Sequence, residues 1–157
     1  MRIVICAVGR ARTGPLRARY EDYAGRVDGT RLFGRTELRE VEERRALPAL
    51  ELKAREADLL SQSLPKGATV VALDGRGQSL SSEAFAGRLG KWRDAGIADL
   101  AFVIGGADGL DKSIIEKAAL VLSLGAMTWP HLLARAMLAE QIYRAATILQ
   151  GHPYHRA

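Results

Sequence analysis

Phe102-Val103-Ile104-Gly105-Gly106-Ala107-Asp108-Gly109-Leu110 is an apolar run that stops abruptly on glycines. A second glycine loop follows an apolar run over 120–124 and reads Gly125-Ala126-Met127-Thr128-Trp129-Pro130-His131. A long helical pattern comes next, and then the tail His152-Pro153-Tyr154-His155-Arg156-Ala157, which is rich in titratable side chains. Two glycine loops, a helix and this tail are concentrated in the C-terminal part of the sequence, so any account of the fold starts there.

Apolar runs typical of buried strands alternate with helical patterns along the whole chain. Continuous, often β-branched runs predict buried strands over 2–8, 69–73, 100–104 and 120–124, and a weaker alternating pattern predicts a strand near a sheet edge over 35–42. Helices are predicted over 15–28, 48–64, 82–95, 112–119 and 130–150. This order predicts an α/β fold with a parallel-rich sheet between helices, in a single domain spanning 1–157.

Composition narrows the class of protein. The apolar fraction of 48% and the charged fraction of 26% are those of a water-soluble globular domain. No apolar run approaches the length needed to cross a bilayer, so we expect a cytoplasmic protein that does not span a membrane. The single cysteine, Cys6, lies inside a predicted strand and is expected to be a small buried hydrophobe.

The net charge of +5 indicates a partner of opposite charge only weakly, because many basic enzymes never touch nucleic acid. The distribution of arginine is more informative, since its planar guanidinium suits phosphate groups and stacking on bases. Arginines recur along the N-terminal part of the chain at Arg10, Arg12, Arg17, Arg19, Arg26, Arg31 and Arg35. This favours an RNA or DNA partner over a merely solvated face.

The expected ligand site lies where strands end. Ligands of parallel sheets collect at the carboxyl ends of strands, and here the strands ending at Leu73, Ile104 and Leu124 lead into loops suited to that role. Glycines in these loops let a ligand approach the backbone because no Cβ intervenes.

Several common ligands are disfavoured because the sequence lacks the motifs that bind them. The glycine spacing is not that of a dinucleotide site, no phosphate loop of the Gly-Lys-Ser/Thr type is present, and no cysteine and histidine pair has zinc spacing. We therefore expect no metal, and a cofactor held by backbone groups and apolar walls. S-adenosylmethionine, which has no phosphate and needs no metal, fits that description. Glu140 and Arg144, four residues apart on the last helix, are predicted to form a salt bridge.

From end to end the chain resembles the RlmH family, rRNA large-subunit pseudouridine N3-methyltransferases of the SPOUT (trefoil-knot) superfamily. The resemblance rests on many short motifs together, and small departures occur at Ala107 and Trp129. The motifs are Val8-Gly9, Glu56, Leu73, Ile104-Gly105-Gly106 with Gly109-Leu110, Leu122-Ser123-Leu124, Met127-Thr128 with Pro130-His131, Glu140-Gln141 with Tyr143-Arg144-Ala145, and His152-Pro153-Tyr154-His155-Arg156.

The resemblance implies a C-terminal trefoil knot, a homodimer, and S-adenosylmethionine bound at the knot. It implies a 23S rRNA substrate within the ribosome or its large subunit. By position, the cofactor residues would be Leu73, Gly106, Gly125, Ala126, Met127, Thr128, Trp129 and Pro130.

The same resemblance suggests catalytic roles in the tail. N3 of pseudouridine must lose a proton, and His155 is the expected acceptor. Tyr154 would orient or stack on the base, and Arg156 and Arg144 would hold phosphate or stabilise the imide anion. His131, at the start of the last helix, is expected to be structural.

Two other functions stay open from sequence. One is a non-enzymatic RNA- or ribosome-binding protein that keeps the knotted fold. The other is a knotted methyltransferase acting on tRNA, which the absence of an appended RNA-binding domain disfavours.

Overall fold

The computed structural model describes residues 1–155, and for His155 only the backbone. Within these residues five strands form one sheet in the order β2-β1-β4-β3-β5, and every neighbouring pair is parallel. The strands are β1 (Arg2–Val8), β2 (Thr36–Val41), β3 (Thr69–Ser79), β4 (Asp99–Ile104) and β5 (Leu120–Ser123). The predicted α/β class with a parallel sheet is confirmed, and β2 lies at the sheet edge as its weak pattern indicated.

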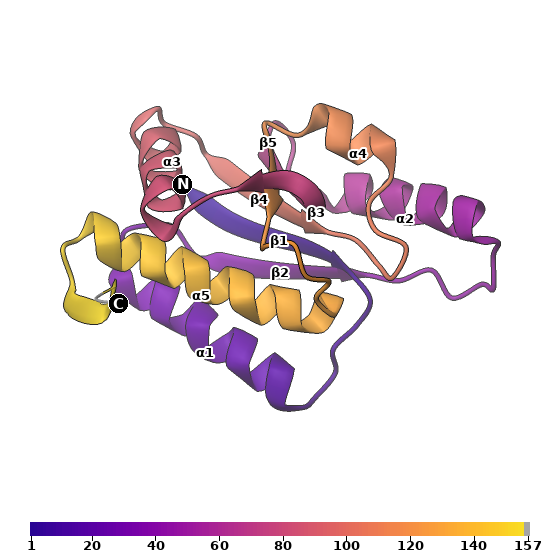
Figure 1. Cartoon of the computed structure of the whole chain (residues 1–157), viewed down its shortest axis with the longest axis horizontal. Helices are drawn as coiled ribbons and strands as arrows, with labels where there is room; N and C mark the ends of the chain where they lie inside the picture. The colour runs from indigo at the N-terminus through magenta and orange to yellow at the C-terminus, as the bar shows by residue number, and fades with distance from the viewer. Residues whose placement is uncertain (156–157) are drawn as a thin grey trace.

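Helices cover both faces of the sheet (Figure 1). On one face lie α1 (Pro15–Thr30), α3 (Ser82–Asp94) and α5 (His131–Leu149); on the other lie α2 (Ala49–Ser63) and α4 (Lys112–Lys117). Alternation along β1 shows how the sequence builds two cores: Ile3 and Ile5 pack toward the first face, whereas Val4 and Cys6 pack toward the second. The buried position of Cys6 is confirmed.

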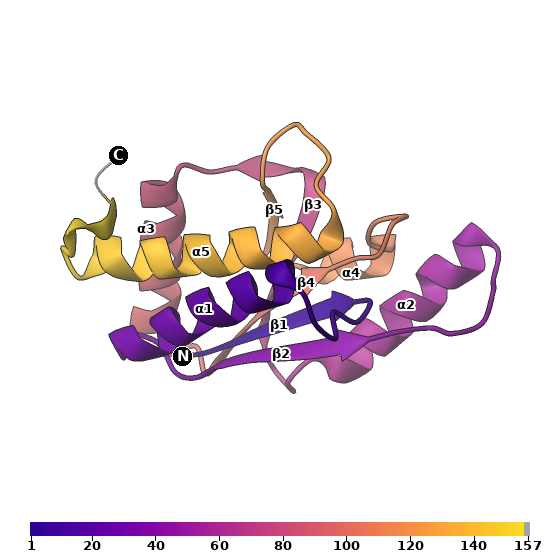
Figure 2. The ribbon, with the colours of Figure 1, turned by 90° about the horizontal axis from the view of Figure 1, so that it is seen from below.

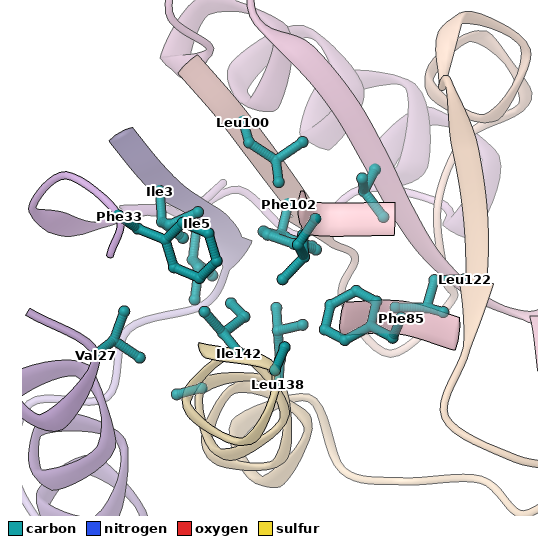
Figure 3. Close-up of a cluster of buried hydrophobic side chains, with 14 of the residues drawn as sticks. Ile3, Ile5, Val27, Phe33, Phe85, Leu100, Phe102, Leu122, Leu138 and Ile142 are labelled. Carbon is teal, nitrogen blue, oxygen red and sulfur yellow. The ribbon is translucent and has the colours of Figure 1, made fainter. Parts of the chain in front are cut away.

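The larger core lies between the sheet and α5. Phe102 in β4 meets Phe85 of α3 edge to face, with ring centroids 6.2 Å apart. Leu138 and Ile142 of α5 point toward Phe102 and the other core side chains (Figure 3). Burying each such side chain stabilises the fold by about 1.5–3 kcal/mol. This packing holds α5 along the sheet, so that its two ends lie at fixed places.

Local signals set most helix boundaries. Ser81 and Asp111 cap α3 and α4 as predicted, accepting hydrogen bonds from the N–H groups of Ala84 (3.1 Å) and Ser113 (2.8 Å). The prediction that α1 ends at residue 28 was wrong, because α1 runs to Thr30. Asp28 lies within the last turn and accepts a 2.7 Å hydrogen bond from the N–H of Thr36, at the start of β2.

The predicted end of β3 at Leu73 was also wrong, since the strand continues to Ser79 with a register shift. Leu73 and Gln78 both pair with Leu122 of β5, so the segment between them bulges past that strand. A Cβ on Gly77 would lie 2.6 Å from the carbonyl oxygen of Val121, and only glycine allows this crossing. In Figure 2 the 124–130 segment rises beyond the end of β3 and turns back to α5. The turn-like composition of 74–78 is therefore overridden by pairing with β5.

Candidate active site

The carboxyl ends of β4 and β5 and the middle of β3 meet around a cavity of about 250 Å³. Leu73, Ile104 and Leu124 all line it, so the structure brings together the three segments that the sequence singled out, although the one after Leu73 belongs to β3 and is not a loop. The expected cofactor residues Gly125, Ala126, Met127, Thr128 and Trp129 line the same cavity.

Ser123 links two of these loops. Its hydroxyl lies 3.3 Å from the carbonyl oxygen of Gly75 and 3.1 Å from that of Gly125, and it accepts a hydrogen bond from the N–H of Gly125 at 3.2 Å. Gly125 has φ 113°, in the left-handed region that favours glycine. Ser123 therefore holds the two walls together, a role the sequence did not reveal.

The 124–130 loop presents large apolar side chains at the cavity. Met127 is 73% exposed and Trp129 is 38% exposed. The Trp129 indole N–H donates to the carbonyl oxygen of Leu124 at 3.3 Å, which ties the two ends of the loop. Exposed apolar side chains beside a cavity are typical of a ligand site.

Gly106 and Pro130 are expected cofactor residues that do not line this cavity. A Cβ on Gly106 would lie 3.0 Å from both carboxylate oxygens of the buried Glu56, so Gly106 packs against α2. Its neighbour Gly105 lines the cavity, and a Cβ there would lie 2.7 Å from the backbone of Gly109. Pro130 is the N-cap of α5. The structure thus gives Gly105 the closer position to the cavity.

Two ionisable side chains line the cavity, Asp74 and His131. A hydrogen bond from Arg76 holds the pKa of Asp74 below its ordinary value, so Asp74 is charged at neutral pH. Burial, and then the charge of Arg135, lower the pKa of His131, which is therefore neutral there. No lysine or arginine is among the described lining residues, but Arg76, which lies outside the lining, pairs with Asp74 at 2.9 Å and balances its charge. Asp74 directly follows Leu73, so the rule that selected Leu73 could have found it.

A second cluster lies toward the far end of α5. Arg144 and Glu140 form the predicted salt bridge at 2.7 Å, and the Tyr154 hydroxyl donates to the same Glu140 oxygen at 3.2 Å. The Tyr154 ring lies 4.6 Å from that of Tyr143, and the Arg144 guanidinium lies 5.2 Å from the Tyr154 ring. Burial, followed by the neighbouring Tyr23 and Glu140, raises the pKa of Tyr154, so its hydroxyl stays protonated. The side chain of His155, and Arg156, lie outside the described part of the chain.

The two clusters are separated within one chain. Glu140 and His131 are nine residues apart on α5, which is about 14 Å along the helix axis. Residues 152–155 and the 124–130 loop lie toward opposite ends of α5 (Figure 1). Reacting atoms must approach to about 3–3.5 Å, so the described tail residues do not complete the cavity of their own chain.

Within residues 1–155 no three histidine, cysteine, aspartate or glutamate side chains are grouped so that they could hold a metal ion. None of the described helices is both long and apolar enough to cross a membrane.

Two solved structures share the fold of this chain. A probable methyltransferase from Bordetella pertussis Tohama I superposes with a TM-score of 0.52 at 20% identity, covering 92% of this chain and 95% of that one. A probable methylase family protein from Haemophilus influenzae Rd KW20 gives a TM-score of 0.53 at 12% identity, covering 99% of this chain and 70% of that one. At such identities the likeness shows the fold alone.

The sequence profile described as "Predicted SPOUT methyltransferase" matches residues 1–155, which places the chain in the class of SPOUT-type methyltransferases. The chain is 59% identical over 157 residues to "Ribosomal RNA large subunit methyltransferase H" of Rhodospirillum centenum, covering 100% of both chains. It is 53% identical to the protein of that name from Paramagnetospirillum magneticum, covering 99% of both. The chain belongs to the ribosomal RNA large subunit methyltransferase H (RlmH) family.

Proposed function

We propose that this protein transfers the methyl group of S-adenosylmethionine to N3 of a pseudouridine in 23S rRNA, acting in the cytoplasm on the ribosome or its large subunit. The observation that carries the proposal is the full-length identity of 59% to a relative whose name states rRNA large-subunit methylation.

The cavity at the carboxyl edge suits this cofactor. S-adenosylmethionine, when bound, supplies an electrophilic methyl group on a positively charged sulfonium. Leu73, Met127 and Trp129 offer apolar contact, and the glycine loops offer backbone donors and acceptors. Asp74, whose carboxylate is paired with Arg76, is the acidic side chain of the cavity lining that would complement a sulfonium. The residues present therefore fit the cofactor.

The chemistry at the base needs a proton acceptor. N3 of pseudouridine carries a hydrogen, so its proton leaves as the N3–methyl bond forms, and we assign acceptance of that proton to His155. Tyr154 orients the base, while Arg144 and Arg156 stabilise the negative charge that develops on the imide. Glu140 positions Tyr154 and Arg144, because one of its carboxylate oxygens accepts from both.

A second copy of the chain is part of the proposal. Since the described tail residues, as far as Tyr154, lie away from the cavity of their own chain, a homodimer in which the partner subunit contributes the tail would complete the site. A largely apolar groove of about 580 Å³ runs beside α5, and Gly125 and Glu140 both line it. Leu80, Leu133 and Met137 add apolar surface there for a partner to cover.

The test uses ribosomes from cells that lack this protein. Incubation with the pure protein and S-adenosylmethionine is expected to add one methyl group to one pseudouridine of 23S rRNA, located by mass mapping of RNA fragments. Cofactor binding by calorimetry without any methyl transfer to ribosomes, subunits or free rRNA would contradict the proposal and favour a non-enzymatic binding protein.

A further inference from the structure

We infer that the loop over residues 9–14 binds the phosphate backbone of the substrate RNA, with Arg10 and Arg12 as the phosphate contacts. The inference rests on the proposed function, since it takes RNA as the substrate, and it names the surface that would hold this RNA beside the cavity.

The charges of this loop are free, whereas most arginines are neutralised. Ion pairs are formed by Arg2, Arg17, Arg19, Arg26, Arg39, Arg44, Arg45, Arg55, Arg76, Arg93, Arg135 and Arg144. Arg10 and Arg12 are exposed, and neither has a carboxylate partner among the described residues. Exposed guanidinium groups without a local counter-charge suit phosphate oxygens, to which they can donate paired hydrogen bonds.

The loop lies at the same edge of the sheet as the cavity. It follows the carboxyl end of β1, which is parallel to and paired with β4. A Cβ on Gly9 would lie 3.1 Å from Nε2 of His131, and His131 lines the cavity. Gly9 has φ 86°, so glycine is favoured both by its backbone and by this close approach. The loop that carries the two arginines therefore begins at a residue that lies against the wall of the cavity.

A buried network holds the loop in place. Arg135 donates to the carbonyl oxygens of Val8 (2.6 Å) and Gly9 (2.8 Å) and to Glu40 (2.6 Å). Glu40 in turn accepts from the backbone N–H of Ala11 at 2.9 Å. Because Glu40 is engaged in these bonds, it anchors the backbone without neutralising the arginines beyond it. A loop ordered before binding loses less entropy when RNA binds.

The charges also differ between the cavity and its rim. The one carboxylate that lines the cavity, Asp74, is paired with Arg76, and no arginine or lysine is among the described lining residues, whereas Arg10 and Arg12 carry unpaired positive charge outside it. The RNA backbone would thus stay on the loop while the target base enters the cavity.

The test compares two double variants that remove equal charge. R10Q/R12Q alters the loop, and R31Q/R35Q alters two other exposed arginines, between α1 and β2 at the opposite edge of the sheet. Neither pair forms an ion pair within the described chain, so the melting temperature and the affinity for S-adenosylmethionine should stay unchanged in both. Binding of each protein to ribosomes from cells lacking it is measured over a series of KCl concentrations.

Loss of two phosphate contacts should weaken ribosome binding by R10Q/R12Q and make its plot of log affinity against log salt less steep by roughly 1.5. R31Q/R35Q should keep the wild-type affinity and the wild-type slope. The inference would be overturned if R10Q/R12Q kept the wild-type affinity and slope, or if both variants lost the same amount of ribosome affinity. Methyl transfer by the wild-type protein to the same ribosomes is measured separately. Transfer together with unchanged binding of R10Q/R12Q overturns this inference alone, whereas no transfer contradicts the proposed function and leaves the binding comparison to decide the role of the loop.

Discussion

The hydroxyl of Tyr154 donates a 3.2 Å hydrogen bond to a carboxylate oxygen of Glu140, which also accepts a 2.7 Å hydrogen bond from Arg144. This contact ties the tail to α5 and sets where its aromatic ring lies. The tail is therefore an ordered element of the fold as far as Tyr154, which a short C-terminal segment of this composition need not be.

Tyr154→Phe keeps the ring but removes this hydrogen bond. The net contribution of such a bond is about 1 kcal/mol, so we expect the rate of rRNA methylation to fall about fivefold. Affinity for S-adenosylmethionine by calorimetry should not change, because Tyr154 is assigned to orienting the base and not to holding the cofactor. Tyr154→Ala also removes the contacts with Tyr143 and Arg144, so its rate of rRNA methylation should fall further. Equal methylation rates for Tyr154→Phe and wild type would show that the hydroxyl is dispensable.

Mixing two inactive variants tests whether the site is shared between subunits. A chain truncated before Tyr154 lacks the tail, and Leu73→Arg blocks the cavity. Each alone should be inactive, but random exchange of subunits should restore roughly a quarter of wild-type activity, since half of the dimers are mixed and each has one intact site. Methylation of rRNA by the mixture is the measurement. No recovery, with mixed dimers shown by mass spectrometry, would mean that each chain uses its own tail.

Asp74→Asn tests the charge of the cavity. S-adenosylmethionine carries a positive sulfonium that S-adenosylhomocysteine lacks, so losing the carboxylate should weaken the first ligand more. An attraction of about 1 kcal/mol corresponds to a roughly fivefold change in the ratio of the two affinities. Calorimetry with both ligands measures this ratio. Asp108→Asn, an exposed residue that does not line the cavity, is the matched control, and parallel weakening of both ligands in Asp74→Asn would argue against a charge effect.

Gly106→Ala tests the packing behind the cavity. The added Cβ would lie 3.0 Å from the Glu56 carboxylate and 3.2 Å from Val8, so we expect a loss of about 1–3 kcal/mol in the free energy of unfolding. Gly87→Ala is the control: it lies in α3 with no atom within 4 Å of the new Cβ, and it should stabilise by about 0.5–1 kcal/mol. Urea unfolding measures both, and a neutral Gly106→Ala would show that Glu56 moves aside freely.

Glu56 should make stability depend on pH. Burial, and then the charge of Asp108, raise the pKa of Glu56 above its ordinary value. The folded state therefore binds this proton more tightly than the unfolded state, and stability is lost as pH rises from about 4.3 through the raised value. Glu56→Gln cannot ionise, so it should gain stability relative to wild type across that window, as followed by urea unfolding.

Glu37 should make stability depend on pH in the opposite direction, and Glu37→Gln tests this. A hydrogen bond from Arg39 lowers the pKa of Glu37, so its contribution is present above the ordinary pKa and lost as pH falls through the lowered value. The glutamine variant should be less stable than wild type near neutral pH. A Glu56→Gln protein that behaves in the same way would contradict the raised pKa of Glu56.

The sequence was enough to predict the secondary-structure order, the parallel sheet and the convergence of the segments after Leu73, Ile104 and Leu124. These follow from local patterns: apolar runs mark buried strands, and Ser81 and Asp111 cap their helices through bonds to residues two or three positions away. The elements that were misjudged depend on distant partners. The end of β3 depended on pairing with Leu122, and no local signal near residue 74 contains that information.

For the candidate site too, some residues could be predicted from sequence and others were assigned only by the tertiary structure. Leu73 and Gly125 could be selected from sequence because predicted strand ends and glycines are local features, whereas residues 126–129 were expected from the family resemblance. Tertiary structure alone assigned Gly105 to the cavity and Gly106 to the packing against Glu56, and it separated the tail from the cavity along α5. It also revealed Arg135, which reaches across 127 positions of sequence to the carbonyl of Val8 and holds the arginine loop at the rim. The physical reason is that periodicity and capping act over one or two turns of chain, whereas which side chain faces a ligand depends on contacts that exist only once the sheet has assembled.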